Sequence, residues 1–213
     1  MKSSISILSS KNRLEYINEL NYTDCDYIHV DVMDGKFVPD TQFSLNETKA
    51  VNYVSNKLLD IHLMVDNPIN YINNYKGYNI EYITFHIECG KDMDKIINKI
   101  HKMGYKVGIS IKPKTDIKEI EEYLSKIDLV LVMSVEPGKG GQKFIKDTTK
   151  RVKYLRKIIN DNKYDVKISV DGGINNETVK LVSDADMVVI GSYLLNGNNR
   201  YEYKRYLKKV IGK

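Results

Sequence analysis

The chain has 213 residues, of which 42% are hydrophobic and 29% are charged, and this predicts one domain over residues 1–213 with a sizeable core. The net charge of +5 is modest and spread along the chain, which does not favour nucleic-acid binding and is compatible with a small anionic substrate. Cys25 and Cys89 lack CxxC spacing, so we expect no disulfide framework and a cytoplasmic, reducing location. No apolar run is long enough for a signal peptide or a membrane span, so no membrane association is expected.

Short apolar segments alternate with helical patterns along the whole chain. In chain order, strands are expected over residues 5–8, 27–33, 58–64, 82–86, 105–111, 129–133, 166–170 and 187–190. Helices are expected over residues 13–20, 43–54 (a loop, then a helix), 68–75, 92–103, 117–124, 148–159, 177–182 and 201–211. This alternation predicts an α/β fold, a single (β/α)₈ TIM barrel, with an open doubly wound sheet as the alternative.

Residues 29–35, with the sequence His-Val-Asp-Val-Met-Asp-Gly, indicate the end of a buried strand that enters a tight turn. Because side chains alternate along a strand, His29 and Asp31 lie on one face, where an imidazole and a carboxylate can bind one cation. Alone, this stretch is more simply interpreted as a buried His–Asp pair. However, His62 and Asp171 also lie near the ends of expected strands. In a barrel those ends form one face, where active sites lie.

Three glycine-containing loops follow the last three expected strands. They are residues 137–142, the pair Gly172 and Gly173, and the pair Gly191 and Ser192. Glycine allows backbone N–H groups to crowd round an anion, and barrels commonly bind phosphate after their last two strands. Each loop alone could be an ordinary turn, but together they predict a phosphate site.

These motifs, in this order, resemble the ribulose-phosphate 3-epimerase family over nearly the whole chain. The resemblance rests on residues 6–9, 29–35, 37–39, 62–65, 133–138, 140–144, 170–174 and 191–192, together with Pro68. It implies an isomerase that interconverts D-ribulose 5-phosphate and D-xylulose 5-phosphate in the pentose phosphate pathway. Association into homo-oligomers is compatible with this resemblance.

The resemblance also implies roles for individual residues. One divalent metal, with Zn²⁺ or Fe²⁺ favoured and Mn²⁺ or Co²⁺ left open, would be bound by His29, Asp31, His62 and Asp171. Asp31 and Asp171 would be the catalytic acid and base. The sugar phosphate would contact Ser6, His62, Gly138, Lys139, Gly140, Gly141, Asp171, Gly172, Gly173, Gly191 and Ser192. The reacting carbons would pack against Met33, Met64 and Met133, although core filling is the simpler interpretation of each methionine alone.

The implied chemistry explains the need for these residue types. Inverting a carbon beside a ketone requires a proton to leave one face and another to arrive on the opposite face, which two carboxylates can achieve. The intermediate is an enediolate, and a cation can stabilise its developing charge as a Lewis acid. The chain departs from the usual family pattern at Ile5, Lys36, Asp40, Ser44, Leu45 and Lys139. None of these positions is a proposed metal ligand, so the departures bear on loop packing and substrate range and not on the chemistry.

Three other functions remain to be considered. An epimerase for a hexulose phosphate such as allulose 6-phosphate would use the same reacting end, although residues 137–141 and 171–173 fit the pentulose enzyme better. A decarboxylase of the same barrel group would need a lysine proton donor where this chain has Met33. An inactive barrel that only binds a metal or a sugar phosphate would not need the acid–base pair. His86 ends the fourth expected strand and is interpreted as a supporting or structural residue.

Overall fold

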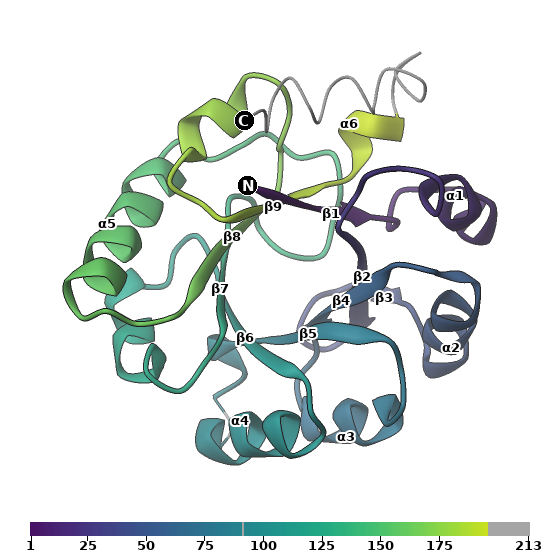
Figure 1. Cartoon of the computed structure of the whole chain (residues 1–213), viewed down its shortest axis with the longest axis horizontal. Coiled ribbons are helices and arrows are strands. Elements are labelled where there is room, and N and C mark those ends of the chain that lie inside the picture. Colours follow the sequence, from purple (N-terminus) through teal and green to yellow (C-terminus); the bar gives the residue numbers. More distant parts are fainter. Residues whose placement is uncertain (91, 196–213) are drawn as a thin grey trace.

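The computed structural model describes residues 1–90 and 92–195, and its strands form a ring surrounded by helices (Figure 1). Neighbouring strands of the ring are parallel, and β1 pairs with both β2 and β9, which closes the barrel. The short strand β3 is antiparallel to β2 and lies at the edge. The predicted TIM barrel is therefore confirmed. The strands are β1 Lys2–Ser6, β2 Tyr27–Asp34, β3 Thr41–Gln42, β4 Leu58–Met64, β5 Ile80–His86, β6 Lys106–Ile111, β7 Leu129–Met133, β8 Lys167–Asp171 and β9 Met187–Ile190.

The helices cover the outside of the ring in the order of the strands they connect (Figure 1). The α-helices are α1 Arg13–Leu20, α2 Leu45–Val54, α3 Ile69–Ile72, α4 Met93–Lys102, α5 Thr148–Asp161 and α6 Ser192–Leu195. Four connections contain 3₁₀ helices, namely η1 Asn73–Tyr75, η2 Ile87–Cys89, η3 Ile117–Tyr123 and η4 Thr178–Val182. The helices predicted near residues 117–124 and 177–182 are thus 3₁₀ helices. The helix predicted over residues 201–211 lies outside the described residues.

The first strand begins earlier than the predicted range of residues 5–8. It spans Lys2–Ser6, because Ser3 and Ser4 pair with strand β9 and Ser4 also pairs with β2. These serines are buried and lack the apolar side chains by which strands are recognised. Strand β3 was not predicted, because two residues are too few to show an alternating pattern.

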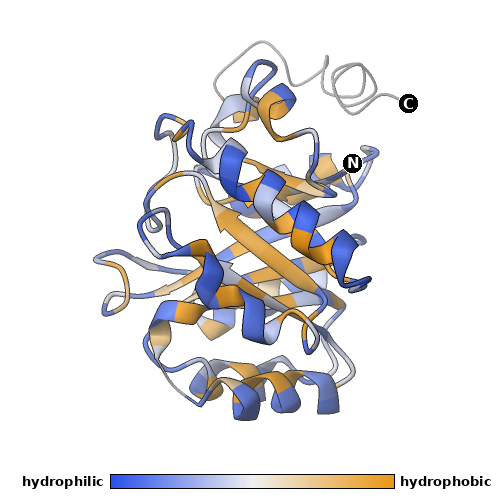
Figure 2. Ribbon diagram, turned by 90° about the vertical axis from the view of Figure 1, so that its left-hand side faces the viewer, coloured by the Kyte–Doolittle hydropathy of each residue, from blue (hydrophilic) through white to orange (hydrophobic). Residues whose placement is uncertain are grey.

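Alternation along the strands separates an apolar outer layer from a polar interior. Outward-facing side chains such as Ile28, Val30 and Ile61 are fully buried against the helices. Figure 2 shows this as hydrophobic strands beneath helices that are hydrophobic on one side and hydrophilic on the other. The interior instead holds buried polar side chains, which are Ser4, Ser6, His29, Asp31, Asp60, His62, Thr84, His86, Ser110 and Ser169.

An apolar cluster closes the barrel at the amino-terminal ends of its strands, below these polar residues. Its buried members are Tyr27, Tyr82, Leu129 and Met187. The rings of Tyr27 and Tyr82 meet edge to face, with centroids 5.8 Å apart. In the described part of the chain, this cluster therefore covers the amino-terminal side of the polar interior.

Helix α2 begins at Ser44, one of the positions that departs from the usual family pattern. The Ser44 side chain accepts a hydrogen bond from the backbone N–H of Glu47, while the Glu47 carboxylate accepts from the backbone N–H of Ser44. This reciprocal capping box satisfies two N–H groups that a helix start otherwise leaves unpaired. The departure at Ser44 therefore supports the local fold.

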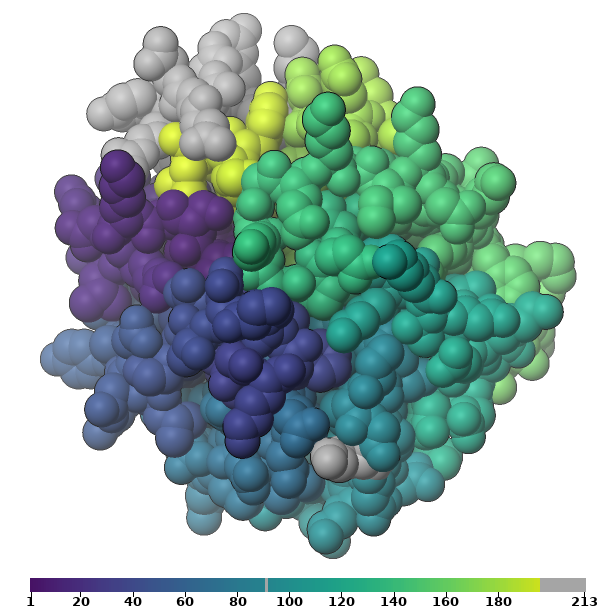
Figure 3. Space-filling view, turned by 180° about the vertical axis from the view of Figure 1, so that it is seen from behind, coloured from purple at the N-terminus to yellow at the C-terminus, as the bar shows by residue number. Residues whose placement is uncertain are grey.

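Loops from distant parts of the chain meet at the carboxyl ends of the strands. Figure 3 shows this face, where the green segment that follows β7 lies against the dark blue segment that follows β2. A side chain added at Gly138 would come within 3.1 Å of Val38 Cβ, so the two loops are in close contact there. Gly138 has a φ of 108°, a backbone conformation that residues with a side chain rarely adopt. Its lack of a side chain also lets the loop pack closely against Val38.

Two other expectations concern membranes and disulfides. Within residues 1–90 and 92–195, no helix has the length and apolar character needed to cross a membrane. Cys25 and Cys89 are both buried free thiols.

We predict that Gly108→Ala destabilises the protein by about 1–3 kcal/mol through overpacking inside the barrel. The new methyl carbon would lie 2.2 Å from Thr84 Oγ1 and 2.9 Å from Thr84 Cβ. Urea unfolding of the variant measures the loss.

The control is Thr84→Ala, because Thr84 Oγ1 hydrogen-bonds to no group in the described part of the chain. Thr84→Ala removes Oγ1 and Cγ2, two of the three atoms that the new methyl carbon would meet. The Gly108→Ala/Thr84→Ala double variant should therefore recover part of the stability lost by Gly108→Ala. Strictly additive losses would contradict this explanation.

Candidate active site

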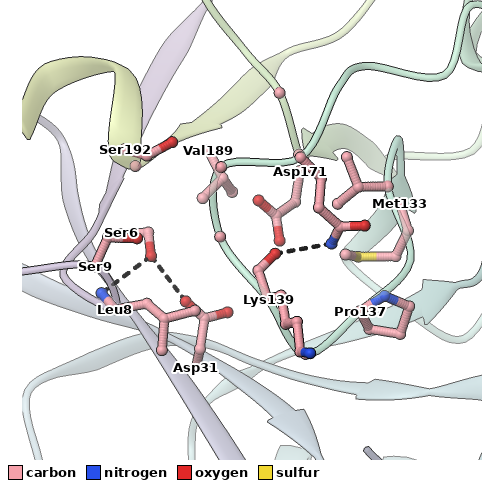
Figure 4. Close-up of a pocket in the computed structure, with 18 of the residues that line it drawn as sticks. Ser6, Leu8, Ser9, Asp31, Met133, Pro137, Lys139, Asp171, Val189 and Ser192 are labelled. Carbon is pink, nitrogen blue, oxygen red and sulfur yellow. Dashed lines mark hydrogen bonds between the residues drawn. The ribbon is translucent and has the colours of Figure 1, made fainter. Parts of the chain in front are cut away.

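A pocket opens at the carboxyl ends of the strands and reaches into the barrel (Figure 4). Among the predicted site residues, those that line it are Ser6, Asp31, Met33, Met64, Met133, Gly138, Lys139, Gly140, Gly141, Asp171, Gly172, Gly173, Gly191 and Ser192. His29 and His62 are fully buried beside it. The structure thus brings every predicted site residue to one end of the barrel, with the two imidazoles beneath the pocket surface.

Four of these side chains form a compact group with suitable ligand atoms. One nitrogen or oxygen from each of His29, Asp31, His62 and Asp171 lies within 4.8 Å of all the others. His62 Nδ1 is 3.3 Å from Asp31 Oδ1 and 3.9 Å from Asp171 Oδ2. The four residues come from three strands, so closure of the barrel is what creates the group.

The side chain of His29 is oriented from below by Asp60. His29 Nδ1 lies 2.7 Å from Asp60 Oδ2, which also accepts a hydrogen bond from Ser4 Oγ at 2.8 Å. The other ring nitrogen, Nε2, is buried 3.2 Å from Asp31 Oδ1 and makes no hydrogen bond to any described residue. Burial disfavours the charged imidazole, but the negative charges of Asp31 and Asp60 raise the pKa of His29 well above its ordinary value.

The two carboxylates that face the pocket differ in their environments. Burial opposes ionisation of Asp31, but the neighbouring His29 and His62 hold the pKa of Asp31 well below its usual range. Asp31 Oδ2 also accepts a hydrogen bond from Ser6 Oγ at 2.8 Å (Figure 4). At Asp171, burial raises the pKa to about 6, against the opposing charge of His29. The pair therefore combines a strongly ionised carboxylate with one that takes up a proton more easily.

The four side chains fit a divalent metal ion. His29 Nε2 has no hydrogen-bond partner among the described residues although it is buried, and it faces Asp31. His62 Nδ1 likewise faces two carboxylates. Zinc–ligand bonds of about 2.0–2.2 Å place neighbouring ligand atoms roughly 3.4 Å apart. Three pairs of these groups lie 3.2, 3.3 and 3.9 Å apart, and all four ligand atoms lie within 4.8 Å of one another. Two imidazoles and two carboxylates also suit Fe²⁺.

His86 does approach this group, through His62. Its Nε2 lies 2.9 Å from His62 Nε2, and its ring is fully buried. Burial lowers the pKa of His86 to about 4, so the ring is neutral at ordinary pH.

The glycine-containing loops form the outer wall of the pocket. Gly172 and Gly173 have positive φ angles of 116° and 61°, a conformation that other residues rarely adopt. A side chain at Gly173 would come within 2.6 Å of the backbone nitrogen of Phe144, so only glycine allows these loops to pack this closely. In the loop after β7, Gln142 Nε2 donates hydrogen bonds to the carbonyl oxygens of Glu136 and Lys139, at 2.7 and 2.8 Å.

Apolar side chains line the inner wall of the pocket. Met33, Met64 and Met133 are each 2% exposed and come from β2, β4 and β7. Met133 packs in a cluster with Val189 of β9, which also lines the pocket. The thioethers and the valine bring no proton donor or acceptor of comparable strength to the carboxylates.

Asp60 and Val189 also belong to the site region but were not identified from the sequence. Asp60 lies two residues before His62, so strand alternation places it on the same face as that histidine, but its partner depends on the register between β2 and β4. Val189 stands in a strand that is apolar on both faces, which hides the residue that points inward.

Comparison with solved structures agrees with the barrel architecture. A phosphoribosylanthranilate isomerase from Thermotoga maritima superposes with a TM-score of 0.68 over all of both chains, at 13% identity. A chain of the tryptophan synthase complex from Pyrococcus furiosus gives a TM-score of 0.65 at 18% identity, over 100% of this chain and 98% of that chain. At such identities the similarity shows the fold alone.

Comparison of sequences identifies the family as well as the fold. The model of the ribulose-phosphate 3 epimerase family matches residues 2–195. The ribulose-phosphate 3-epimerase of Methanocaldococcus jannaschii is 40% identical over 196 residues, which cover 90% of this chain and 83% of that protein. The enzyme of the same name from Bacillus subtilis is 35% identical over 199 residues, with coverages of 92% and 90%. The chain therefore belongs to the ribulose-phosphate 3 epimerase family, and it is an epimerase.

Proposed function

We propose that the protein interconverts D-ribulose 5-phosphate and D-xylulose 5-phosphate by moving protons at C3. Asp31 and Asp171 act as the acid and the base, one on each face of that carbon. The names of the relatives support this choice of substrate. A cytoplasmic location is part of the proposal, because the free thiols of Cys25 and Cys89 suit a reducing compartment.

The observation that carries the proposal is the placement of the two carboxylates. Asp31 lies near the carboxyl end of β2 and Asp171 is the last residue of β8, and β1 and β9 lie between these strands in the ring. Both side chains point into the same pocket (Figure 4). A sugar carbon held between them would present one face to each carboxylate, as inversion at that carbon requires.

The side chains around the carboxylates control the proton transfer. Ser6 Oγ donates to Asp31 Oδ2 and accepts from the backbone N–H of Leu8 at 3.3 Å, so the position of the Asp31 carboxylate is fixed from one side. An ionised carboxylate takes the proton from C3, and the partner carboxylic acid returns one to the opposite face. The methionine side chains exclude water from this region without offering a competing proton.

The metal would be held by His29, Asp31, His62 and Asp171, whose ligand atoms already converge. When bound, a divalent cation supplies Lewis-acid stabilisation to the negative charge that develops on the oxygens beside the reacting carbon. At the other end of the pocket, Gly172, Gly173, Gly191 and Ser192 would receive the phosphate. Binding energy from that end orients C3 between the carboxylates.

A comparison of substrates tests the proposal. Ribulose 5-phosphate should have the highest kcat/KM, and unphosphorylated ribulose should lose kcat as well as gain KM, because the phosphate contributes orientation. Steady-state assays with ribulose 5-phosphate, ribulose and allulose 6-phosphate measure this. A higher kcat/KM for the hexulose phosphate would identify the protein as a hexulose-phosphate epimerase, and no turnover of any substrate would indicate an inactive barrel.

A second prediction concerns the metal. Purified protein should contain about one transition metal per chain, and His62→Ala should lose most of it, because one of only four protein ligands is removed. Elemental analysis measures both. The control is His101→Ala, which alters an exposed histidine on α4 that pairs with Asp128. Full metal content in His62→Ala would remove this residue from the site.

A third prediction concerns the acid–base pair. Asp171→Asn keeps the shape of the side chain but cannot accept the proton, so epimerisation should fall by about 10²–10⁴-fold. In D₂O, wild-type protein should place deuterium at C3 of the product. The variant, checked for metal content, should still exchange the C3 proton of one epimer slowly through Asp31.

NMR of each epimer, incubated separately with Asp171→Asn, distinguishes the mechanisms. Exchange confined to one epimer is the expected result. Equal exchange of both epimers, or wild-type product that retains the proton of the substrate, would indicate a single base.

A further inference from the structure

A chain of hydrogen-bonded side chains runs outward from the buried His62 to the loop after β6. His62 Nε2 lies 2.9 Å from His86 Nε2, and His86 Nδ1 lies 3.0 Å from Glu88 Oε2. The centroids of the two imidazole rings are 5.0 Å apart, much farther than these nitrogens, so the rings meet at their edges as a hydrogen bond requires. The chain continues into the loop after β6, because Glu88 Oε1 accepts hydrogen bonds from the backbone N–H of Lys112 and from Thr115 Oγ1.

The direction of each hydrogen bond follows from the carboxylate at the end of the chain. An ionised Glu88 can only accept, so His86 Nδ1 carries a proton and donates it. A neutral imidazole carries one N–H proton, so a His86 that donates from Nδ1 has an Nε2 that accepts. His62 Nε2 must then be the donor. With its proton at Nε2, a neutral His62 keeps its electron pair at Nδ1, which lies 3.3 Å from Asp31 Oδ1 and 3.9 Å from Asp171 Oδ2. A metal ion bound between these groups would replace the proton that Nδ1 and Asp31 can otherwise share.

We propose that Glu88 and His86 are positioning residues that fix the tautomer of His62, so that its Nδ1 is available to a metal ion. The inference rests on the metal site of the proposed function. His29 shows the opposite arrangement, since its Nδ1 pairs with Asp60 and its Nε2 faces the site. Each ligand nitrogen is thus selected by the hydrogen bond at the other nitrogen of the same ring.

Glu88→Gln should reverse the whole chain of hydrogen bonds. The backbone N–H of Lys112 is an obligatory donor and Thr115 Oγ1 donates to the same oxygen, so the glutamine keeps its carbonyl oxygen toward them. Its NH₂ group then faces His86 Nδ1, which must accept. His86 therefore donates from Nε2, and His62 has to carry its own proton at Nδ1, where it blocks the metal.

Zinc affinity, measured by chelator competition with purified full-length protein, tests the reversal without relying on turnover. Glu88→Gln should weaken zinc binding about 10–100-fold, the usual effect of losing the outer partner of a metal-binding histidine. The matched control is Thr115→Val, which removes one hydrogen bond to Glu88 Oε1 but leaves Oε2 free to accept from His86. If Glu88 only anchored the loop, the two variants would bind zinc equally well.

A second pair of variants tests His86 directly. The side chain of His86→Gln can still donate to Glu88 and accept from His62, so zinc affinity should remain close to that of the wild type. His86→Leu can do neither, and its affinity should fall as in Glu88→Gln. Nitrogen-15 NMR of zinc-loaded wild-type protein should show His62 protonated at Nε2 and metal-bound at Nδ1.

The outcomes separate this inference from the proposed function. Unchanged zinc affinity in Glu88→Gln, or a wild-type His62 protonated at Nδ1, overturns the positioning role and leaves the proposed epimerase reaction standing. A wild-type protein that binds no zinc or other divalent metal, with turnover intact, overturns the metal site and this inference together.

Discussion

The structure depends on a constraint of buried charge: ionisable groups inside a barrel must find partners there, because little water reaches them. Parallel strands place alternate residues on the interior face, and in this chain the interior positions carry carboxylates, imidazoles and hydroxyls. Ser4 and Asp60 support His29, while Ser6 supports Asp31. The apolar cluster below and the apolar outer layer shield this network from water on those sides, which strengthens its hydrogen bonds.

Much of this arrangement could be predicted from the sequence, because the strands are short apolar runs and the polar site residues stand where those runs end. His29 and His62 are examples, since each shares a strand face with a residue that lines the pocket. The hydrogen-bond partners of these histidines could not be predicted in the same way. That Asp60 meets His29 depends on the register between β2 and β4, which alternation within one strand does not determine.

The first strand shows a different limit. Hydropathy favoured residues 5–8, whereas the strand spans Lys2–Ser6 and contains three serines. Ser4 and Ser6 face inward, where small hydroxyl side chains suit a crowded polar interior better than branched apolar ones. A strand that contributes hydrogen bonds to an active site therefore lacks the pattern that identifies an ordinary core strand.

The two hydrogen bonds of Gln142 have a consequence for the entropy of ligand binding. By joining its side chain to the carbonyl groups of Glu136 and Lys139, Gln142 ties the loop after β7 into a compact unit. Ordering the backbone of a free loop costs about 1–2 kcal/mol per residue. Here much of that cost has been met during folding, so a larger share of the contact energy of an incoming anion remains as affinity.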